Sequence, residues 1–466
     1  MRKTKIVATI GPVSCEYDQL KALAEAGVNI FRLNFSHGTH EWHGEVIKRI
    51  KRLNQEMPEK YAILLDTKGP EIRSGDLKKP IPLNVGDEVI LSIDHPDYEK
   101  DGKISVNYDG FVSDVSVGDK ILVDSGIMSW EVISKTEVDV VCKVLDEGEL
   151  TSRRHLNIPG KDVSLDPITP KDWEDINFGI EMGVDFIALS FVRHAEEINT
   201  LKDYLHKKKS KISIIAKIES YEATNHLGVI TKAADGIMVA RGDLGAEVSM
   251  AEVPALQIEI IETAAQYKKP VIVATHMLES MIEHPVPTRA EVTDISTAVW
   301  QSTDATMLSG ESAGGEYPVR SVETMSEIII EAEKISGENP LRNLVVSDER
   351  EAFALTAATM PFDLPEVEAI MVITRSGQTA RLVSSFRPHV PIFAFTNETT
   401  TRRQLQLVWG VHAQLIDFSS VPEKTIERAE AAFLAQNPDW KGRRYVLVSD
   451  FIVEDKFIPT LQVRDL

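Results

Sequence analysis

The 466-residue sequence has few cysteines, a deficit of basic residues and no long apolar run. Its two cysteines, Cys15 and Cys142, are far apart and lack the spacing of metal ligands, which argues against a zinc site and favours a reducing compartment. Acidic residues outnumber basic ones 72 to 51, and the formal charge of −21 opposes general binding to nucleic acid or to anionic membranes. No apolar stretch approaches the roughly 18 residues of a membrane span, and the N-terminal one is too short for a signal peptide. We therefore expect a cytoplasmic protein that binds neither nucleic acid nor membrane.

Several familiar catalytic loops are also missing from the sequence. It contains no Walker loop, no Gly-x-Ser-x-Gly elbow and no dinucleotide-binding fingerprint. Acyl transfer through a serine nucleophile and hydride transfer from a nicotinamide therefore have no support.

Length and patterning predict several domains, one of them a barrel. The chain is about three times the size of a typical domain. Short apolar runs alternate with amphipathic helical segments, a pattern typical of βαβ units, and eight such units close a (β/α)8 TIM barrel. We predict this α/β fold, with an open doubly wound sheet as the alternative. The eight runs are residues 5–10, 29–35, 61–66, 185–191, 212–218, 236–240, 270–275 and 304–308.

A long gap between the third and fourth runs predicts an inserted domain. Its β-branched runs broken by turns are typical of a β-rich unit, here a β-barrel lid. The unit leaves the barrel directly after a strand, on the face where barrel enzymes place their active sites. After the eighth run, further strands alternate with helices and predict a C-terminal α/β domain. The expected domains are a catalytic barrel of residues 1–70 and 169–338, a lid of residues 71–168 and a C-terminal domain of residues 339–466.

Polar side chains follow several of the predicted barrel strands. Residues two apart in a strand point to the same side, so these side chains are expected to converge on one rim of the barrel. A single charged residue at a strand end is commonly a solvated surface group, but the repetition on many strands indicates a functional site. The groups concerned are Arg32, Asn34 and Ser36; Asp66 and Lys68; Lys217 and Glu219; and Arg241, Gly242 and Asp243.

These residue types favour a small, multiply anionic substrate. Glu219 and Asp243 on adjacent strands suit a hard divalent ion such as Mg²⁺ or Mn²⁺ that keeps open positions for substrate oxygens. Lys217 adds fixed positive charge where negative charge develops on a phosphoryl group or an enolate. Backbone N–H groups of Gly242 and Asp243 can hold a carboxylate or phosphate if they open a helix.

Seven segments of the sequence resemble motifs of the pyruvate kinase family, in the family's order and over nearly the whole chain. The resemblance implies transfer of the phosphoryl group of phosphoenolpyruvate to ADP, giving pyruvate and ATP, with Mg²⁺ (or Mn²⁺) and K⁺. It also implies a homotetramer and a regulatory role for the C-terminal domain. The segments are TKIVATIGP (4–12), FRLNFSHG (31–38), LDTKGPEIR (65–73), IIAKIES (214–220), IMVARGDLG (237–245), THMLESM (275–281) and MLSGE (307–311).

The resemblance also implies a role for each matching residue. Lys217 would stabilise the transition state, Arg32 would contact the phosphate of phosphoenolpyruvate, and Thr275 would orient the proton donor to the enolate. Glu71 resembles the residue of the K⁺-dependent members. The implied binding sets are Gly242, Asp243 and Thr275 for the substrate carboxylate; Asn34, His37, Arg73 and Arg154 for the nucleotide; Glu219 and Asp243 for Mg²⁺; and Asn34, Ser36, Asp66 and Thr67 for K⁺.

A phosphorylated effector is expected in the C-terminal domain. The segment 374–379 follows a predicted strand and opens a helix, which suits a phosphate group, although an ordinary capped turn has the same pattern. The effector stays unnamed, because residues 449–459 lack the glycine-rich loop that usually closes over it in the family. The expected phosphate contacts are Thr374, Ser376, Gly377 and Thr379.

Two other functions remain open at this point. A Mg²⁺-dependent barrel lyase acting on phosphoenolpyruvate or pyruvate would use the same metal and arginine, but it would need no lid for a nucleotide. A non-catalytic metabolite sensor could keep the fold, but it would not need Lys217, Glu219, Asp243 and Arg32 together.

Overall fold

A computed structural model describes residues 1–124, 126–161, 165–335, 345–453 and 456–466. Eight parallel strands close a barrel in the order β1-β16-β15-β14-β13-β12-β3-β2, which confirms the predicted barrel. Each of the eight barrel strands lies within one of the eight predicted runs. The strands are β1 (Lys5–Ile10), β2 (Ile30–Asn34), β3 (Ala62–Asp66), β12 (Phe186–Leu189), β13 (Ser213–Ile218), β14 (Gly236–Ala240), β15 (Val271–Ala274) and β16 (Ala305–Leu308).

Helices cover the outside of the barrel and bury one face each. In α2, for example, Val46, Ile50 and Leu53 are spaced by about one helical turn and pack against the strands, while Thr39 caps the N-terminus by accepting a hydrogen bond from the backbone N–H of Trp42. The helices of this layer are α1 (Tyr17–Ala26), α2 (His40–Glu56), α5 (Pro170–Met182), α6 (Ala195–Lys207), α7 (Tyr221–Asn225), α8 (Leu227–Ala233), α9 (Arg241–Glu247), α10 (Val253–Gln266), α11 (Arg289–Trp300), α12 (Gly310–Ala313) and α13 (Pro318–Lys334).

Apolar side chains fill the interior of the barrel. Val7, Ile30 and Leu64 belong to one buried cluster with residues of the other strands, and Leu407 from the C-terminal part of the chain joins the same cluster. The barrel is therefore a packed core and not a channel, and polar chemistry is confined to its rims.

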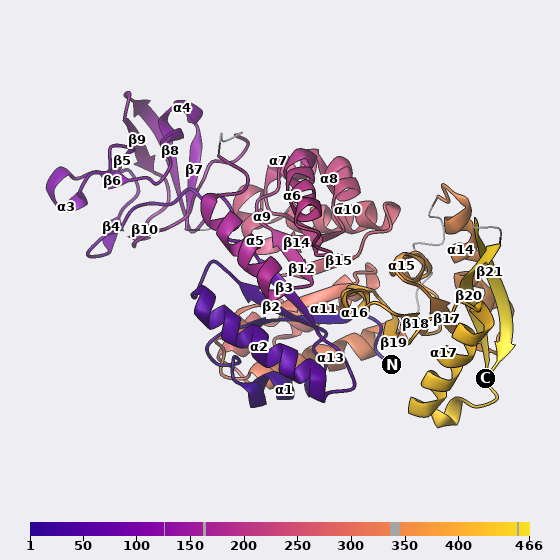
Figure 1. The fold of residues 1–466 in the computed structure, drawn as a ribbon. Helices are drawn as coiled ribbons and strands as arrows, with labels where there is room; N and C mark the ends of the chain where they lie inside the picture. Colours follow the sequence, from indigo (N-terminus) through magenta and orange to yellow (C-terminus); the bar gives the residue numbers. More distant parts are fainter. Residues whose placement is uncertain (125, 162–164, 336–344, 454–455) are drawn as a thin grey trace.

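The insertion after β3 is a six-stranded sheet in the order β11-β7-β8-β9-β5-β6, with a two-stranded sheet of β4 and β10. Figure 1 shows it at one end of the barrel, away from the C-terminal part. Its core is separate and centres on Trp130, which is fully buried. The elements are β4 (Ile81–Leu83), β5 (Glu88–Ser92), α3 (Tyr98–Asp101), β6 (Ile104–Ser105), α4 (Phe111–Asp114), β7 (Lys120–Val123), β8 (Met128–Lys135), β9 (Asp139–Val144), β10 (Gly148–Leu150) and β11 (Leu156–Asn157).

The C-terminal part is a five-stranded sheet in the order β19-β18-β17-β20-β21, flanked by helices. Its last strand, β21, is antiparallel to β20 and was not predicted from the sequence. The proposed boundary between residues 338 and 339 lies outside the described residues. The elements are α14 (Glu349–Asp363), β17 (Val367–Ile373), α15 (Gln378–Ser385), β18 (Ile392–Thr396), α16 (Thr399–Gln404), β19 (Val411–Leu415), α17 (Pro422–Gln436), β20 (Arg444–Val453) and β21 (Lys456–Asp465).

Across the described part of the chain, no helix is both long and apolar enough to cross a membrane.

Candidate active site

A network of buried charges occupies the rim of the barrel where the strands end. Lys217 Nζ lies 2.8 Å from Glu219 Oε1 and 3.0 Å from Asp66 Oδ1, and it donates a hydrogen bond of 2.7 Å to Ser190 Oγ. Arg32 Nε donates to the other oxygen of Asp66 at 2.6 Å. Four of the strand-end residues predicted from the sequence are thus brought together by direct contacts, whereas Arg241 does not line the cleft and instead lies 2.8 Å from Asp294.

Strand register explains this convergence. Asn34 at the end of β2 pairs with Asp66 at the end of β3, and Asp66 pairs with Ala188 in β12. On the far side of β12, β13 carries Lys217. Because neighbouring parallel strands end at similar heights, side chains near their carboxyl ends reach one another over the apolar interior.

Burial and pairing set the charge state of the network. Asp66 is completely buried, which alone raises the pKa of its carboxyl group, but Arg32 and Lys217 outweigh burial and hold that pKa below its usual value. Burial acts to lower the pKa of Lys217, and the carboxylates of Asp66, Glu219 and Asp243 overcome it and raise that pKa. Lys217 is therefore a fixed cation at neutral pH.

Glu219 has the donor chemistry of a metal ligand. Its carboxylate is completely buried, and burial together with the neighbouring Asp243 raises its pKa even though Lys217 opposes the shift. Glu219 Oε2 accepts a hydrogen bond of 2.6 Å from the backbone N–H of Phe191, whereas among the described residues Oε1 has only its ion pair with Lys217. A further cation at Oε1 would offset the cost of burying this charge, so the residues present fit a divalent ion.

A cleft of about 480 Å³ opens beside this network. Most of the residues expected from the sequence line it, with Asp66 behind them and completely buried. Gly242 adjoins the lining residue Asp243, and its backbone N–H donates a hydrogen bond of 2.8 Å to Thr275 Oγ1. The cleft is lined by Arg32, Asn34, Ser36, His37, Thr67, Lys68, Glu71, Arg73, Arg153, His155, Phe191, Lys217, Glu219 and Asp243.

The residues expected to hold K⁺ lie around one corner of the cleft. Asn34 Oδ1 accepts a hydrogen bond of 3.1 Å from the backbone N–H of Ser36. Thr67 Oγ1 donates a hydrogen bond of 3.3 Å to the carbonyl of Ala188. Both oxygens of Asp66 already contact Arg32 or Lys217, so a monovalent ion would share that carboxylate with them.

Glu71 joins the insertion to the rim of the barrel. Arg73 Nε lies 2.6 Å from Glu71 Oε2, His155 Nε2 lies 3.0 Å from Oε1, and Lys68 Nζ lies 3.8 Å from Oε2. Burial works against the charged carboxylate, but the contacts with His155 and Arg73 outweigh it and lower the pKa of Glu71 to about 2. Arg73 and His155 also form a backbone bridge, so this charged cluster sits where the insertion leaves and rejoins the barrel.

Two neighbouring arginines of the insertion differ in their relation to the cleft, and only Arg154 was expected there from the sequence. Arg154, expected at the nucleotide, lies 3.1 Å from Asp124 Oδ1 and is not among the residues that line the cleft. Its neighbour Arg153 lines the cleft and holds both oxygens of Asp76, at 2.7 and 2.9 Å. The sequence could not show which of the two side chains points into the cleft. The backbone of Arg153 has a positive φ of 57°, so the regular alternation of side chains along a strand does not hold there.

Ser190 is a member of the charge network that sequence reasoning missed, as it missed Arg153 and His155 in the lining of the cleft. It contacts Lys217 through its hydroxyl, as described above, and donates a hydrogen bond of 2.7 Å to the carbonyl of Thr67. The signal was present, because Ser190 directly follows β12 as Thr67 directly follows β3, and the same strand-end rule would have found it.

The expected effector residues surround a second cavity, of about 400 Å³, in the C-terminal sheet. Thr374, Ser376 and Thr379 line it, and Gly377 with φ of 80° is the N-cap of α15. Thr374 Oγ1 accepts a hydrogen bond of 3.0 Å from the Gly377 N–H. Arg350 and Arg375 also line this cavity and give it positive charge.

Comparisons with known proteins agree with this geometry. Residues 1–322 match the family described as the pyruvate kinase barrel domain, and residues 351–456 match the pyruvate kinase alpha/beta domain. The chain is 47% identical to pyruvate kinase isozyme G, chloroplastic, of Nicotiana tabacum, over 96% of this chain and 80% of the relative. It is 44% identical to the pyruvate kinase of Bacillus licheniformis, over 92% and 74% of the two chains.

A solved structure is similar over the whole molecule. The crystal structure of a pyruvate kinase from Cryptosporidium parvum superposes with a TM-score of 0.92 at 34% identity, covering 99% of this chain and 96% of that one. The cytoplasmic location stays a prediction, since the tobacco relative is named chloroplastic and the Bacillus name gives no compartment. Fold, rim chemistry and both family matches lead to one assignment: the chain is a phosphotransferase and belongs to the pyruvate kinase family.

Proposed function

We propose that the enzyme transfers the phosphoryl group of phosphoenolpyruvate to ADP in the 480 Å³ cleft, giving pyruvate and ATP. The observation that carries the proposal is the pair of buried cations, Arg32 and Lys217, held on opposite oxygens of Asp66 beside Glu219. Fixed positive charge in a water-poor site favours a transition state in which negative charge spreads over phosphoryl oxygens.

The layout of the rim supports a specific mode of substrate binding. Arg32 binds the phosphate of phosphoenolpyruvate, and the turn of Gly242, Asp243 and Thr275 binds its carboxylate end. Arg32 is pre-oriented, because Nη1 donates to Thr9 Oγ1 at 2.8 Å and Nε holds Asp66. Such positioning lowers the entropic part of the barrier before any bond changes.

Phosphoryl transfer breaks the bond between phosphorus and the enol oxygen and forms one to the terminal phosphate oxygen of ADP. Lys217 stabilises the charge on the phosphoryl oxygens and on the enolate. The enolate then takes a proton at its methylene carbon. The hydroxyl of Thr275 donates to the carbonyl of Ala274 at 2.6 Å and accepts from Gly242, so it orients the donor and a water molecule relays the proton.

Two cations complete the proposed chemistry. Glu219 and Asp243 would hold Mg²⁺ or Mn²⁺, which supplies charge neutralisation at the phosphoryl oxygens. The K⁺ set is Asn34, Ser36, Asp66 and Thr67, and Glu71 makes the enzyme depend on K⁺ because it places a carboxylate in the cleft and not a cation.

The nucleotide is proposed to bind between the rim and the insertion. Asn34, His37 and Arg73 line the cleft on that side, and Arg153 adds a cation there. Arg154 reaches the nucleotide if the insertion moves toward the barrel, as a lid does. A barrel lyase would need no lid over a nucleotide, so the insertion favours the kinase over the lyase. A non-catalytic sensor would not need the complete charge network of the rim, so that network favours an enzyme over a sensor.

The proposal also includes regulation by an effector and assembly of several copies of the chain. A phosphorylated effector binds at Thr374, Ser376, Gly377 and Thr379 in the cavity of the C-terminal sheet, and the enzyme assembles as a homotetramer. The N-cap of α15 supplies backbone N–H groups, and Arg350 and Arg375 supply charge.

The test is pyruvate formation from phosphoenolpyruvate, ADP and Mg²⁺, coupled to lactate dehydrogenase, in KCl and in NaCl at equal ionic strength. We expect activity that needs K⁺. Activity indifferent to K⁺ would keep the kinase and remove the monovalent site. No activity in either salt, with sugar phosphates present, would favour the sensor.

A further inference from the structure

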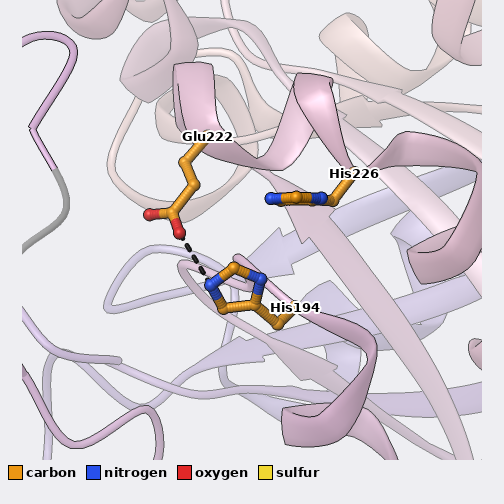
Figure 2. Close-up of side chains that lie close together, drawn as sticks. All are labelled: His194, Glu222 and His226. Carbon is orange, nitrogen blue, oxygen red and sulfur yellow. Dashed lines mark ion pairs between the residues drawn. The ribbon is translucent and has the colours of Figure 1, made fainter.

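Two histidines and a glutamate cluster on the barrel outside the active-site cleft. His194 directly precedes α6, Glu222 lies in α7, and His226 directly follows α7. One nitrogen or oxygen atom of each lies within 4.8 Å of those of the other two. In Figure 2, Glu222 and His226 extend from one helical stretch, and His194 faces them from a separate loop.

The local sequence explains the cluster. Glu222 and His226 are four residues apart, so a helical turn places them on the same side. His194 occupies the N-cap position of α6, but its side chain makes no capping hydrogen bond. Its Nε2 lies instead 2.7 Å from Glu222 Oε1. The side chain of His194 is therefore directed across the gap between two βα loops.

We propose that His194, Glu222 and His226 bind a divalent transition-metal ion of the zinc type, separate from the proposed Mg²⁺ site. Two imidazoles and one carboxylate are a donor set that suits Zn²⁺, Co²⁺ or Ni²⁺, whereas Mg²⁺ prefers oxygen ligands. Three protein ligands leave at least one position for water or another small ligand.

The distances allow binding with small side-chain movements. Zinc bonds of about 2.0–2.2 Å in a tetrahedral site place neighbouring ligand atoms about 3.4 Å apart. Glu222 is the more buried anchor, with 16% of its side chain exposed against 45% for His194. The rings of His194 and His226 are 4.8 Å apart between centroids. Rotation of the more exposed imidazoles is enough to bring the three atoms onto one ion.

A cavity beside the cluster gives an ion access to it. Glu222 and His226 line a cavity of about 290 Å³ between the barrel and the insertion. Glu247 lines the same cavity and accepts a hydrogen bond of 2.7 Å from Asn157 Nδ2, a residue of the insertion. The cavity gives an ion a route from solvent, and Glu247 adds beside the cluster a further carboxyl group, whose pKa is raised to about 7 by burial and by the nearby Asp243 and Glu222.

A bound ion would join the two loops that position Glu219. The backbone N–H of Phe191, three residues before His194, donates the 2.6 Å hydrogen bond to Glu219 Oε2, and Glu219 lies three residues before Glu222. An ion on His194, Glu222 and His226 would thus hold together the same two loops, with His194 and Glu222 three residues beyond Phe191 and Glu219. We expect it to stabilise the folded enzyme, because it binds the native arrangement and not the unfolded chain.

The test is titration of the full-length protein with Zn²⁺ by calorimetry, with excess Mg²⁺ present to occupy the Glu219 and Asp243 site. We expect one Zn²⁺ ion per chain in addition to Mg²⁺. His194→Gln and His226→Gln should each weaken this binding at least about tenfold, because each removes a ligand. His206→Gln, at an exposed position of α6, is the matched control and should bind as the wild type does.

Two further readouts do not depend on catalysis. Co²⁺ should give visible d–d absorption in the wild type and the control, and lose it in both variants. Zn²⁺ should raise the unfolding temperature of the wild type and not of the variants, whose metal-free unfolding temperatures report whether they fold. Absence of Zn²⁺ binding to the wild type, or unchanged binding in both variants, would overturn the proposal.

Discussion

Arg387, in the C-terminal part of the chain, holds both carboxylate oxygens of Asp304, which directly precedes the last barrel strand. The two distances are 3.0 Å from Nη1 to Oδ1 and 2.9 Å from Nη2 to Oδ2. Both side chains are almost fully buried. Asp304 also accepts hydrogen bonds from the backbone N–H groups of Val271 and Trp409. One ion pair thereby ties the C-terminal sheet to the end of the barrel opposite the active site.

Arg387→Ala should destabilise the protein by about 3–5 kcal/mol, because it leaves a buried carboxylate without its cation. Chemical unfolding monitored by circular dichroism measures the change. Arg387→Lys keeps the charge but not the two-pronged geometry, so its loss should be smaller. The double variant Arg387→Ala, Asp304→Asn should recover part of the stability. Equal stability of Arg387→Ala and the wild type would contradict the structural role.

Lys217→Ala should lower kcat by about 100-fold or more, because Lys217 is a buried cation beside Glu219 at the proposed site of phosphoryl transfer. The coupled lactate dehydrogenase assay measures it. Lys207→Ala, at an exposed position of α6, is the control. Retention of more than about a tenth of the wild-type kcat, worth under about 1.4 kcal/mol of barrier, would show that Lys217 has another role.

Glu71→Lys should bring the ratio of activity in KCl to activity in NaCl close to one. The substitution puts a cation at the position where the wild type has a carboxylate lining the cleft, so an added monovalent cation is no longer needed. Glu88→Lys, exposed at the start of β5, is the matched charge control. An unchanged ratio in Glu71→Lys would separate Glu71 from K⁺ dependence.

The stability of the folded protein should decrease as the pH is lowered, in part because of His412. Burial, and then the nearby positive charges of Lys5, the N-terminal amine and Arg2, lower the pKa of His412 to about 3. The unfolded chain takes up a proton near pH 6.5 and the folded state does not, so the free energy of unfolding drops by up to about 1.4 kcal/mol per pH unit between about 6.5 and 3. Replacing this histidine removes that proton uptake.

Denaturant titrations at pH 7 and pH 5 measure this effect. His412→Gln should show a smaller decrease in unfolding free energy than the wild type, whereas the exposed control His206→Gln should not differ from it. Equal pH dependence in all three proteins would mean that folded His412 binds its proton as readily as the unfolded chain.

The C-terminal cavity should respond to a phosphorylated ligand. We expect at least one member of a panel of sugar phosphates and AMP to lower the half-saturating concentration of phosphoenolpyruvate. Thr374→Ala combined with Ser376→Ala should weaken that response, because both residues line the cavity, and Thr356→Ala on α14 should not. Unchanged half-saturation across the whole panel would contradict effector binding.

The barrel and its rim were predictable because both follow from local periodicity. The run 236–240 coincides with β14, and the two-residue spacing of Lys217 and Glu219 was enough to place them together. β21 could not be found in this way, because it is an edge strand whose conformation depends on hydrogen bonding to β20. The pairing of Arg387 with Asp304 also escapes sequence reasoning, since nothing local joins residues 83 positions apart.

The position of the insertion has a consequence for how the chain folds. β3 and β12 are neighbours in the barrel, with Leu65 opposite Ile187, yet the insertion separates them in sequence. The Ile63 N–H and the Asp185 carboxylate that meet at the base of this pair are 122 residues apart. Such non-local pairing adds a loop-closure cost before it brings stabilising contacts, and it forms slowly. Barrel closure at the seam between β3 and β12 is therefore a late folding event, and the insertion, with a core of its own, can form before it.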